Sequence, residues 1–215
     1  MTTIAIMQPY FYPYAGYFRL FSRADLFVIY DCVQFPRRGW VHRNRLTAAD
    51  GSLQWLTLRL AYAPQETAIR DMRLEAGAMT QLTEDLQRFP TLAGAPPADL
   101  AALPLLVGTG DLVDYLASNL QTALDRLSIQ CPMRRSSELA IDPSLRGQAR
   151  ILAIARELGA TRYLNSPGGR DLYDERAFRE SGIALEFLEP SAGATSSMLE
   201  RLLAETTGAI RADAC

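Results

Sequence analysis

Two short apolar runs frame the first thirty residues, and the order of the segments between them constrains the fold most. The runs are residues 3–7 and 26–30, and each is typical of a buried strand. Pro9 and Pro13 hold the chain after the first run in an extended path. Residues 16–25 then return to the apolar spacing of a helix. This order of strand, loop, helix and strand predicts an N-terminal βαβ unit in a parallel sheet.

Later segments continue the alternation of strands and helices. We expect residues 33–47 to form a basic loop and residues 90–110, rich in proline, to form a loop or hinge. Further strands are expected at residues 53–60, 69–74, just before 134, 162–165 and 183–187. Helices are expected at residues 76–89, 111–127 (capped by Asp111), 145–158 (closed by Gly159), 175–181 and 195–209. The pattern predicts one α/β domain over residues 1–215, with a Rossmann-like parallel sheet, flanking helices and a mostly helical C-terminal half.

Missing residue types exclude several chemistries. All 22 basic residues are arginines, so the chain has no lysine for a P-loop, a pyridoxal phosphate Schiff base or a lysine general base. His42 is the single histidine, and the three cysteines lie far apart without a C-x-x-C pair. We therefore expect no metal site and no cofactor.

Global charge and hydropathy limit the partners. The net charge is −2, which predicts no nucleic acid partner, and no apolar run approaches the roughly 20 residues of a membrane helix. The first residues lack the basic start of a signal peptide, so a cytoplasmic location is expected. The sequence is compatible with a homodimer and does not determine the oligomeric state.

An aromatic segment over residues 8–18 leaves the first predicted strand at the edge where open α/β sheets bind ligands. Its candidate ligand-binding residues are Gln8, Phe11, Tyr14 and Tyr17. Tyrosine offers a polar hydroxyl on an apolar ring, which suits a pocket wall. The same residues could equally plug the edge of the sheet.

A basic stretch follows the second predicted strand. Its four arginines, at positions 37, 38, 43 and 45, surround Trp40 and could hold a phosphate or carboxylate, while the indole stacks on a ring. A solvated loop paired with the chain's own acids is the alternative. The local charge favours a small anionic ligand over DNA or RNA.

Other candidate residues are less distinctive. His42 could act as a general base near neutral pH, or be a bystander. Ser136 and Ser137 follow a predicted strand, and Gly168 and Gly169 form a turn whose backbone N–H groups could approach an anion.

Several motifs together resemble the WbqC-like protein family. They are Gln8-Pro-Tyr-Phe-x-Pro-Tyr-x-Gly-Tyr-Phe18, Tyr30-Asp-x-Val-Gln-Phe35, Arg38-Gly-Trp-x-x-Arg-Asn-Arg45, Gln54-Trp-Leu-Thr57, Arg135-Ser-Ser-Glu-Leu139 and Tyr163-Leu164. The resemblance implies a bacterial protein, often encoded among genes for surface-polysaccharide or natural-product biosynthesis. The chain departs from the family pattern at Cys32, where an aspartate is usual. It also lacks the usual Trp, His and Tyr within residues 77–97, and has Asn165-Ser166 in place of a Ser-Gly turn.

The layout of the first 35 residues is also similar to pantothenate synthetase and related nucleotidyltransferases. Those enzymes carry a pair of histidines where Gly16 falls here, and this chain has neither. The likeness therefore concerns the fold more than adenylyl transfer.

The family setting suggests an enzyme that transfers an acyl or aminoacyl group to an amine, using an anionic substrate that is nucleotide- or carrier-linked. Asp31 would be the general base or an orienting carboxylate, with a salt bridge to an arginine as the alternative. Arg38 and Arg43 would hold the anion and stabilise negative charge. The polar groups of the substrate would be held by Gln8, Gln34 and Asn44. The alternatives are a non-catalytic binding or assembly protein of the same pathway, and a nucleotidyltransferase-like enzyme.

Overall fold

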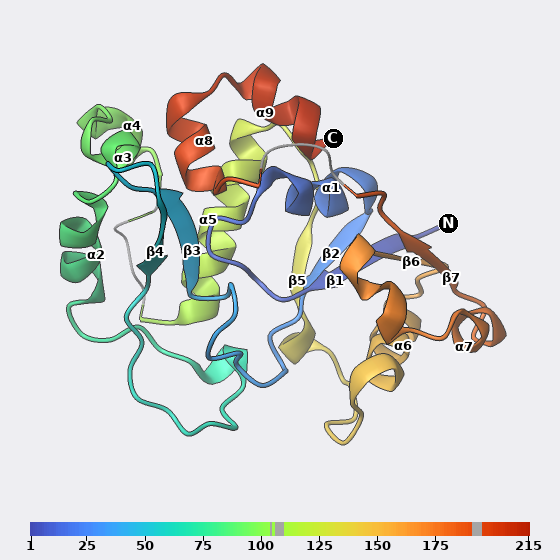
Figure 1. Cartoon of the computed structure of the whole chain (residues 1–215). Coiled ribbons are helices and arrows are strands. Elements are labelled where there is room, and N and C mark those ends of the chain that lie inside the picture. The colour runs from blue at the N-terminus through green and yellow to red at the C-terminus, as the bar shows by residue number, and fades with distance from the viewer. Residues whose placement is uncertain (104, 106–109, 191–194) are drawn as a thin grey trace.

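A five-stranded parallel sheet forms the centre of the computed structural model, which describes residues 1–103, 105, 110–190 and 195–215 (Figure 1). Its strands lie in the order β5-β2-β1-β6-β7, and all neighbours are parallel. Their bounds are β1 (Thr3–Met7), β2 (Leu26–Ile29), β5 (Met133–Arg135), β6 (Arg162–Asn165) and β7 (Ala184–Phe187). If these five strands are numbered 1 to 5 in chain order, their order across the sheet is 3-2-1-4-5. The strand order reverses between β1 and β6, as in Rossmann-type folds. The predicted fold class and N-terminal βαβ unit are confirmed.

The central strand β1 is buried on both faces because helices cover each side of the sheet. Ala5 belongs to a large apolar core with Phe18 and Phe21, whereas Ile4 and Ile6 pack into a second core. The first core includes side chains of α1 (Ala15–Arg23), α5 (Leu112–Arg126) and α9 (Thr207–Ala214). The second includes side chains of α6 (Gly147–Glu157) and α7 (Glu175–Glu180). The C-terminal half thus supplies helices to both faces and three strands of the sheet.

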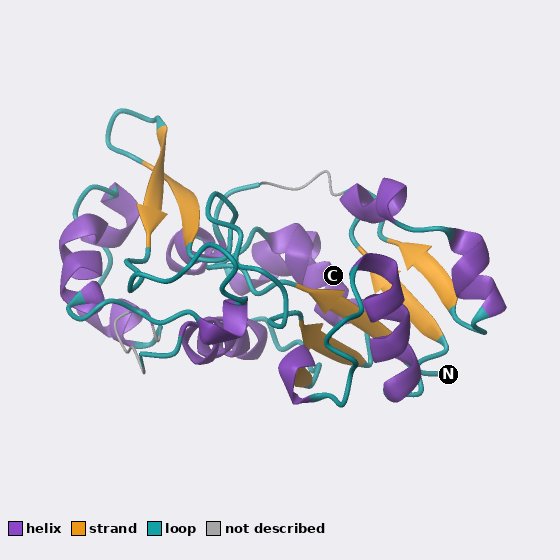
Figure 2. Ribbon diagram, turned by 90° about the horizontal axis from the view of Figure 1, so that it is seen from below, coloured by secondary structure: helices purple, strands orange, loops and turns teal. Residues whose placement is uncertain are grey.

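A separate hairpin lies beside the sheet with three short helices (Figure 2). Its antiparallel strands are β3 (Arg43–Thr47) and β4 (Leu53–Thr57), and the helices are α2 (Ala78–Leu86), α3 (Pro90–Ala93) and α4 (Pro97–Ala101). Leu46 and Leu56 are fully buried in the same core as Ala5. One apolar core therefore joins the hairpin to one face of the sheet.

Helix ends follow the predicted capping. The Asp111 side chain accepts a hydrogen bond from the backbone N–H of Asp114 at 2.9 Å, which caps α5 as expected. Gly159 follows α6 with a positive φ of 62°, a conformation that glycine adopts without strain.

Four predictions of local structure were wrong. Residues 43–47 form β3 instead of a loop, because Asn44 and Leu46 turn inward between exposed polar neighbours. Residues 69–71 form the 3₁₀ turn η1 (Ile69–Asp71) instead of a strand. Residues 90–93 and 97–101, in the stretch predicted as a loop or hinge, form helices α3 and α4 instead of a loop; proline begins each, since the first turn needs no N–H. Residues 104 and 106–109 of that stretch lie outside the described residues. The predicted helix over residues 195–209 is two helices, α8 (Met198–Ala204) and α9.

Two further 3₁₀ turns, η3 (Ser136–Glu138) and η4 (Pro167–Leu172), follow β5 and β6 at the carboxyl edge of the sheet. None of the helices in the described ranges is long and apolar enough to cross a membrane.

Candidate functional site

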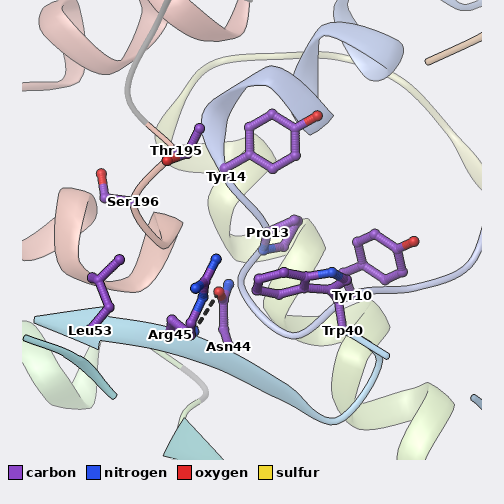
Figure 3. A pocket seen from close by; sticks show the side chains of 9 residues that line it. All are labelled: Tyr10, Pro13, Tyr14, Trp40, Asn44, Arg45, Leu53, Thr195 and Ser196. Atoms are coloured by element: carbon purple, nitrogen blue, oxygen red, sulfur yellow. Dashed lines mark hydrogen bonds between the residues drawn. The ribbon is translucent and has the colours of Figure 1, made fainter. Parts of the chain in front are cut away.

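Two adjoining cavities open where the strand order reverses, and we call them together the crevice. The first, of about 420 Å³, lies at the carboxyl ends of β1 and β6 and includes Arg19, Ser166 and Gly168 in its lining. The second, of about 590 Å³, lies against the hairpin and is drawn in Figure 3. The side chains common to both are Tyr10, Tyr14, Trp40 and Thr195. Open α/β sheets bind their ligands at this position.

The aromatic segment after β1 is partly core and partly wall. Phe11 and Tyr12 are at most 1% exposed, and the Phe11 ring stacks at 6.2 Å from that of Tyr115. Tyr12 has a positive φ of 43°, which reverses the chain so that Tyr10 and Tyr14 face the crevice. Phe11, predicted to contact a ligand, is therefore covered by the protein.

Asn44 holds this segment against the hairpin. Its Nδ2 donates to the backbone carbonyls of Phe11 at 3.0 Å and Tyr12 at 2.6 Å, and also lies 3.3 Å from Oγ of Ser197. Its Oδ1 accepts the backbone N–H of Arg45 at 2.7 Å, the dashed line of Figure 3. Asn44 lines the crevice, but these bonds use its amide for positioning the segment.

Two arginines supply positive charge to the crevice. The Arg45 guanidinium lies 5.4 Å from the ring centre of Trp40 and 5.6 Å from that of Trp55. The Arg19 Nη1 donates to the backbone carbonyl of Glu189 at 2.7 Å. Within the described part of the chain, neither guanidinium lies within 4 Å of a carboxylate. Both can therefore take an anionic ligand.

The other arginines of the basic stretch, Arg37, Arg38 and Arg43, are outside the described lining of the crevice. Arg43 lies 4.1 Å over the Trp55 ring and donates to the carbonyls of Gly39 and Arg38. Arg37 donates to the carbonyls of Ala63 and Pro64. Exposed Arg38 lines neither cavity of the crevice.

Asp31 lies at the end of β2 and faces η3, away from the crevice. It is fully buried, and its carboxylate accepts bonds from Oγ of Ser136 at 2.9 Å and from N and Oγ of Ser137 at 2.9 and 2.7 Å. The structure therefore brings together Asp31, Ser136 and Ser137, but it does not bring Arg38 or Arg43 to them. A carboxylate with three of its acceptor positions occupied holds two strand ends together.

His42 packs against Phe35 on the hairpin, with 5.0 Å between ring centres. Burial, followed by the charges of Arg43 and Arg37, lowers the pKa of His42 to about 4. The imidazole is therefore neutral near pH 7, and its buried Nδ1 has no hydrogen-bond partner among the described residues. It lines a separate cavity with Phe35 and Arg59.

The remaining predicted residues divide between two regions. Tyr17 and Gly168 line the crevice, and the Tyr17 hydroxyl donates to the carbonyl of Gln8 at 2.7 Å. Gly169 packs so closely on Asn165 that a Cβ would lie 2.5 Å from its Nδ2. Gln34 is exposed near β5, where its Nε2 donates to the carbonyl of Gln65.

Sequence reasoning did not assign Tyr10 and Arg19 to the site, and it named Arg45 only as one of four arginines that could hold an anion. Burial and the neighbouring Tyr14 raise the pKa of Tyr10, so its phenol is protonated at neutral pH. Arg19 is one turn into the helix after β1, a position that the fold class makes informative. The described carboxylate that lines the crevice is Glu189, which is 80% exposed and 3.6 Å from Arg170. Across the described ranges, no three His, Cys, Asp or Glu side chains gather to hold a metal ion.

The parallel sheet and its crevice at the reversal of strand order define the class, an α/β protein with a Rossmann-like fold. The model of the WbqC-like protein family matches residues 8–195, and the chain belongs to this family. It is similar to the uncharacterized protein Rv1507c of Mycobacterium tuberculosis (strain ATCC 25618 / H37Rv), at 26% identity over 204 aligned residues, which cover 88% of this chain and 83% of that protein. No solved structure matches the chain. Membership of the family suggests a role in polysaccharide-related biosynthesis and specifies no activity or substrate.

Proposed function

We propose that the protein is an enzyme of polysaccharide-related biosynthesis that binds an anionic, activated small molecule in the crevice and transfers an acyl or aminoacyl group from it to an amine. The observation that carries the binding half of this proposal is the pair Arg19 and Arg45, two guanidinium groups with no described carboxylate within 4 Å; Arg19 lines the cavity at the reversal of strand order, and Arg45 lines the adjoining cavity against the hairpin. Trp40, Tyr10 and Tyr14 add aromatic faces that suit a base, a sugar or an acyl chain.

The transfer half rests on the family setting and on simple chemistry. The amine nitrogen attacks the acyl carbonyl carbon, a C–N bond forms, and the bond from that carbon to a phosphate oxygen or carrier sulfur breaks. The leaving group keeps the electron pair and takes up the proton that the amine loses. A guanidinium beside the leaving group would stabilise the negative charge that develops there.

Thermal unfolding tests the binding half directly. The panel holds ATP, nucleotide sugars, acyl-coenzyme A thioesters and amino acids. A ligand present at 100 times its Kd stabilises the native state by about 2.7 kcal/mol, a rise of roughly 5–10 °C in Tm for this size of chain. We expect Arg45→Gln to abolish the shift. The matched control is Arg176→Gln, which changes an arginine that is 80% exposed on α7. This variant should show the same rise in Tm as wild type.

Two results would contradict the crevice as the binding site: no rise in the Tm of wild type with any compound of the panel, or an equal rise in Arg45→Gln. A ligand found in this way is then incubated with amino sugars, and the products are analysed by mass spectrometry. An amide product supports the transfer.

A non-catalytic binding protein is the second candidate. The observation that favours it is the position of Asp31 and His42, the predicted acid–base groups, outside the crevice. Specific binding that depends on Arg45, without product from any acceptor, supports this candidate over the enzyme.

A further inference from the structure

A second polar pocket opens at the same edge of the sheet, at the carboxyl ends of β2 and β5. It has a volume of about 480 Å³, and among the residues that the structure describes none lines both it and the crevice. Its charged lining consists of Arg70, Arg146 and Arg150 against Glu66 and Asp142, and Cys32 also lines it. We call it the β2–β5 pocket. The function proposed above makes no use of it.

Arg150 is the feature that requires explanation. It projects from α6 and is only 5% exposed, yet no carboxylate among the described residues lies within 4 Å of its guanidinium. Its Nη1 donates to the carbonyl of Cys32 at 3.1 Å, and its Nη2 donates to the carbonyl of Pro143 at 2.9 Å. These neutral acceptors satisfy N–H groups without balancing the charge. A buried guanidinium that no carboxylate contacts is costly, so this site favours an anion placed directly against it.

Three arginines against two carboxylates leave the described lining of the pocket with an excess of one positive charge. Arg146 is exposed and bonds to the carbonyl of Leu145, which leaves its charge without a carboxylate partner in the described residues. Arg70 has Asp71 at 3.5 Å, a weak exposed pair. Asp142 Oδ1 accepts the N–H of Ser144 at 2.8 Å; hydrogen bonds from Ser144 lower the pKa of Asp142, and the charges of Arg146 and Arg150 lower it further, so Asp142 balances part of the positive charge without contacting either guanidinium.

We propose that the β2–β5 pocket is a second binding site, which takes the carboxylate or phosphate group of a small molecule on Arg150 and Arg146. Guanidinium groups bind both oxyanions in a bidentate manner. The site is separate from the crevice, because different described side chains line the two. It could therefore hold a second small molecule at the same sheet edge.

Cys32 provides a reporter inside the pocket. Its Sγ lies 3.6 Å from Nη1 of Arg150, and the side chain is partly exposed. Cys215, exposed at the end of the chain, is an internal control in the same molecule, and Cys131 is buried. Both iodoacetate and iodoacetamide alkylate a thiolate: the sulfur forms a C–S bond and iodide leaves. Only iodoacetate carries a carboxylate.

The experiment measures the rates of alkylation at Cys32 and Cys215 by peptide mass spectrometry at pH 7.5. We expect the ratio of the iodoacetate rate to the iodoacetamide rate to be at least about tenfold higher at Cys32 than at Cys215, because a positive pocket concentrates anions. Inorganic phosphate or succinate should slow both reagents at Cys32 and leave Cys215 unchanged. The anion that protects at the lower concentration identifies phosphate or carboxylate as the preferred group.

Three variants test whether the alkylation ratio depends on the β2–β5 pocket, and distinguish this from an effect of the crevice or of misfolding. Arg150→Met should bring the ratio at Cys32 down to that at Cys215. Arg146→Gln changes an exposed side chain, so it should lower the ratio several-fold while Tm stays within about 2 °C of wild type. Arg45→Gln, in the crevice, should leave the ratio unchanged. Equal ratios at the two thiols in wild type, or no protection by either anion, would overturn the proposal.

Discussion

At the scale of single residues, two side chains with conventional acid–base chemistry serve the fold in this structure. Asp31 connects the end of β2 to η3 through Ser136 and Ser137, and His42 lies neutral against Phe35. A buried carboxylate with hydroxyl and N–H donors stabilises the native state, because each bond to a charged group contributes about 1.5–3 kcal/mol.

The first prediction concerns Asp31. We expect Asp31→Asn to lower the free energy of unfolding by about 2–3 kcal/mol, since the amide loses the charge and replaces one of the two acceptor oxygens with an N–H donor. Urea unfolding measures the change, and Asp99→Asn, at an exposed position on α4, is the control. Unchanged stability with lost turnover would instead support the catalytic role predicted for Asp31.

The second prediction concerns pH. The pKa of His42 is about 4 in the native state and about 6.5 when unfolded, so the unfolded state binds the extra proton first as pH falls. Stability therefore decreases between pH 6.5 and pH 4, and the ring's partial exposure reduces the effect to on the order of 2 kcal/mol. Urea unfolding at pH 7 and at pH 5 measures the free energy of unfolding. Between these two pH values, wild type should lose more of it than His42→Gln. Equal losses in the two proteins would contradict the shifted pKa.

At the scale of elements, the hairpin determines the shape of the crevice. Asn44 of β3 bonds to the segment after β1 and to Ser197 at the start of α8, so one side chain joins three elements. Trp40 and Arg45, at either side of it, line the crevice.

The third prediction follows from this connection. We expect Asn44→Ala to cost about 1–3 kcal/mol of stability, because the buried carbonyl of Phe11 loses the donor that Asn44 supplies and that of Tyr12 loses one donor while keeping Ser197 Oγ and the Met198 N–H. Ligand affinity in the crevice should also fall, since Tyr10 and Tyr14 lose their anchored backbone. Gln54→Ala is the matched control, because the Gln54 amide bonds to Ser52 within the same hairpin. Titration calorimetry with a ligand from the panel measures the affinity, and equal affinities in the two variants would contradict the role of Asn44.

At the scale of the whole molecule, one core spans the sheet and the hairpin. It includes Ala5 of β1, Leu46 of β3 and Leu116 of α5. A core shared in this way makes the two parts depend on each other for burial of apolar surface.

The fourth prediction is that the chain unfolds in a single transition. Trp40 and Trp55, the only tryptophans of the sequence, report on the hairpin, and far-ultraviolet circular dichroism reports on the helices. Urea curves from the two signals should coincide. Loss of the tryptophan signal at lower urea would show that the hairpin unfolds separately.

The sequence by itself determined the α/β class, the βαβ unit, the Asp111 cap and the absence of lysine chemistry, because periodicity and composition are local properties. Only the tertiary structure decided which arginines line the crevice: Arg37 bonds to the carbonyls of Ala63 and Pro64 and Arg43 lies over Trp55, whereas Arg19 and Arg45 face the crevice. The carboxylate of Asp31 likewise meets serines about a hundred residues away. Side-chain roles depend on partners distant in the chain, and one sequence does not specify those partners.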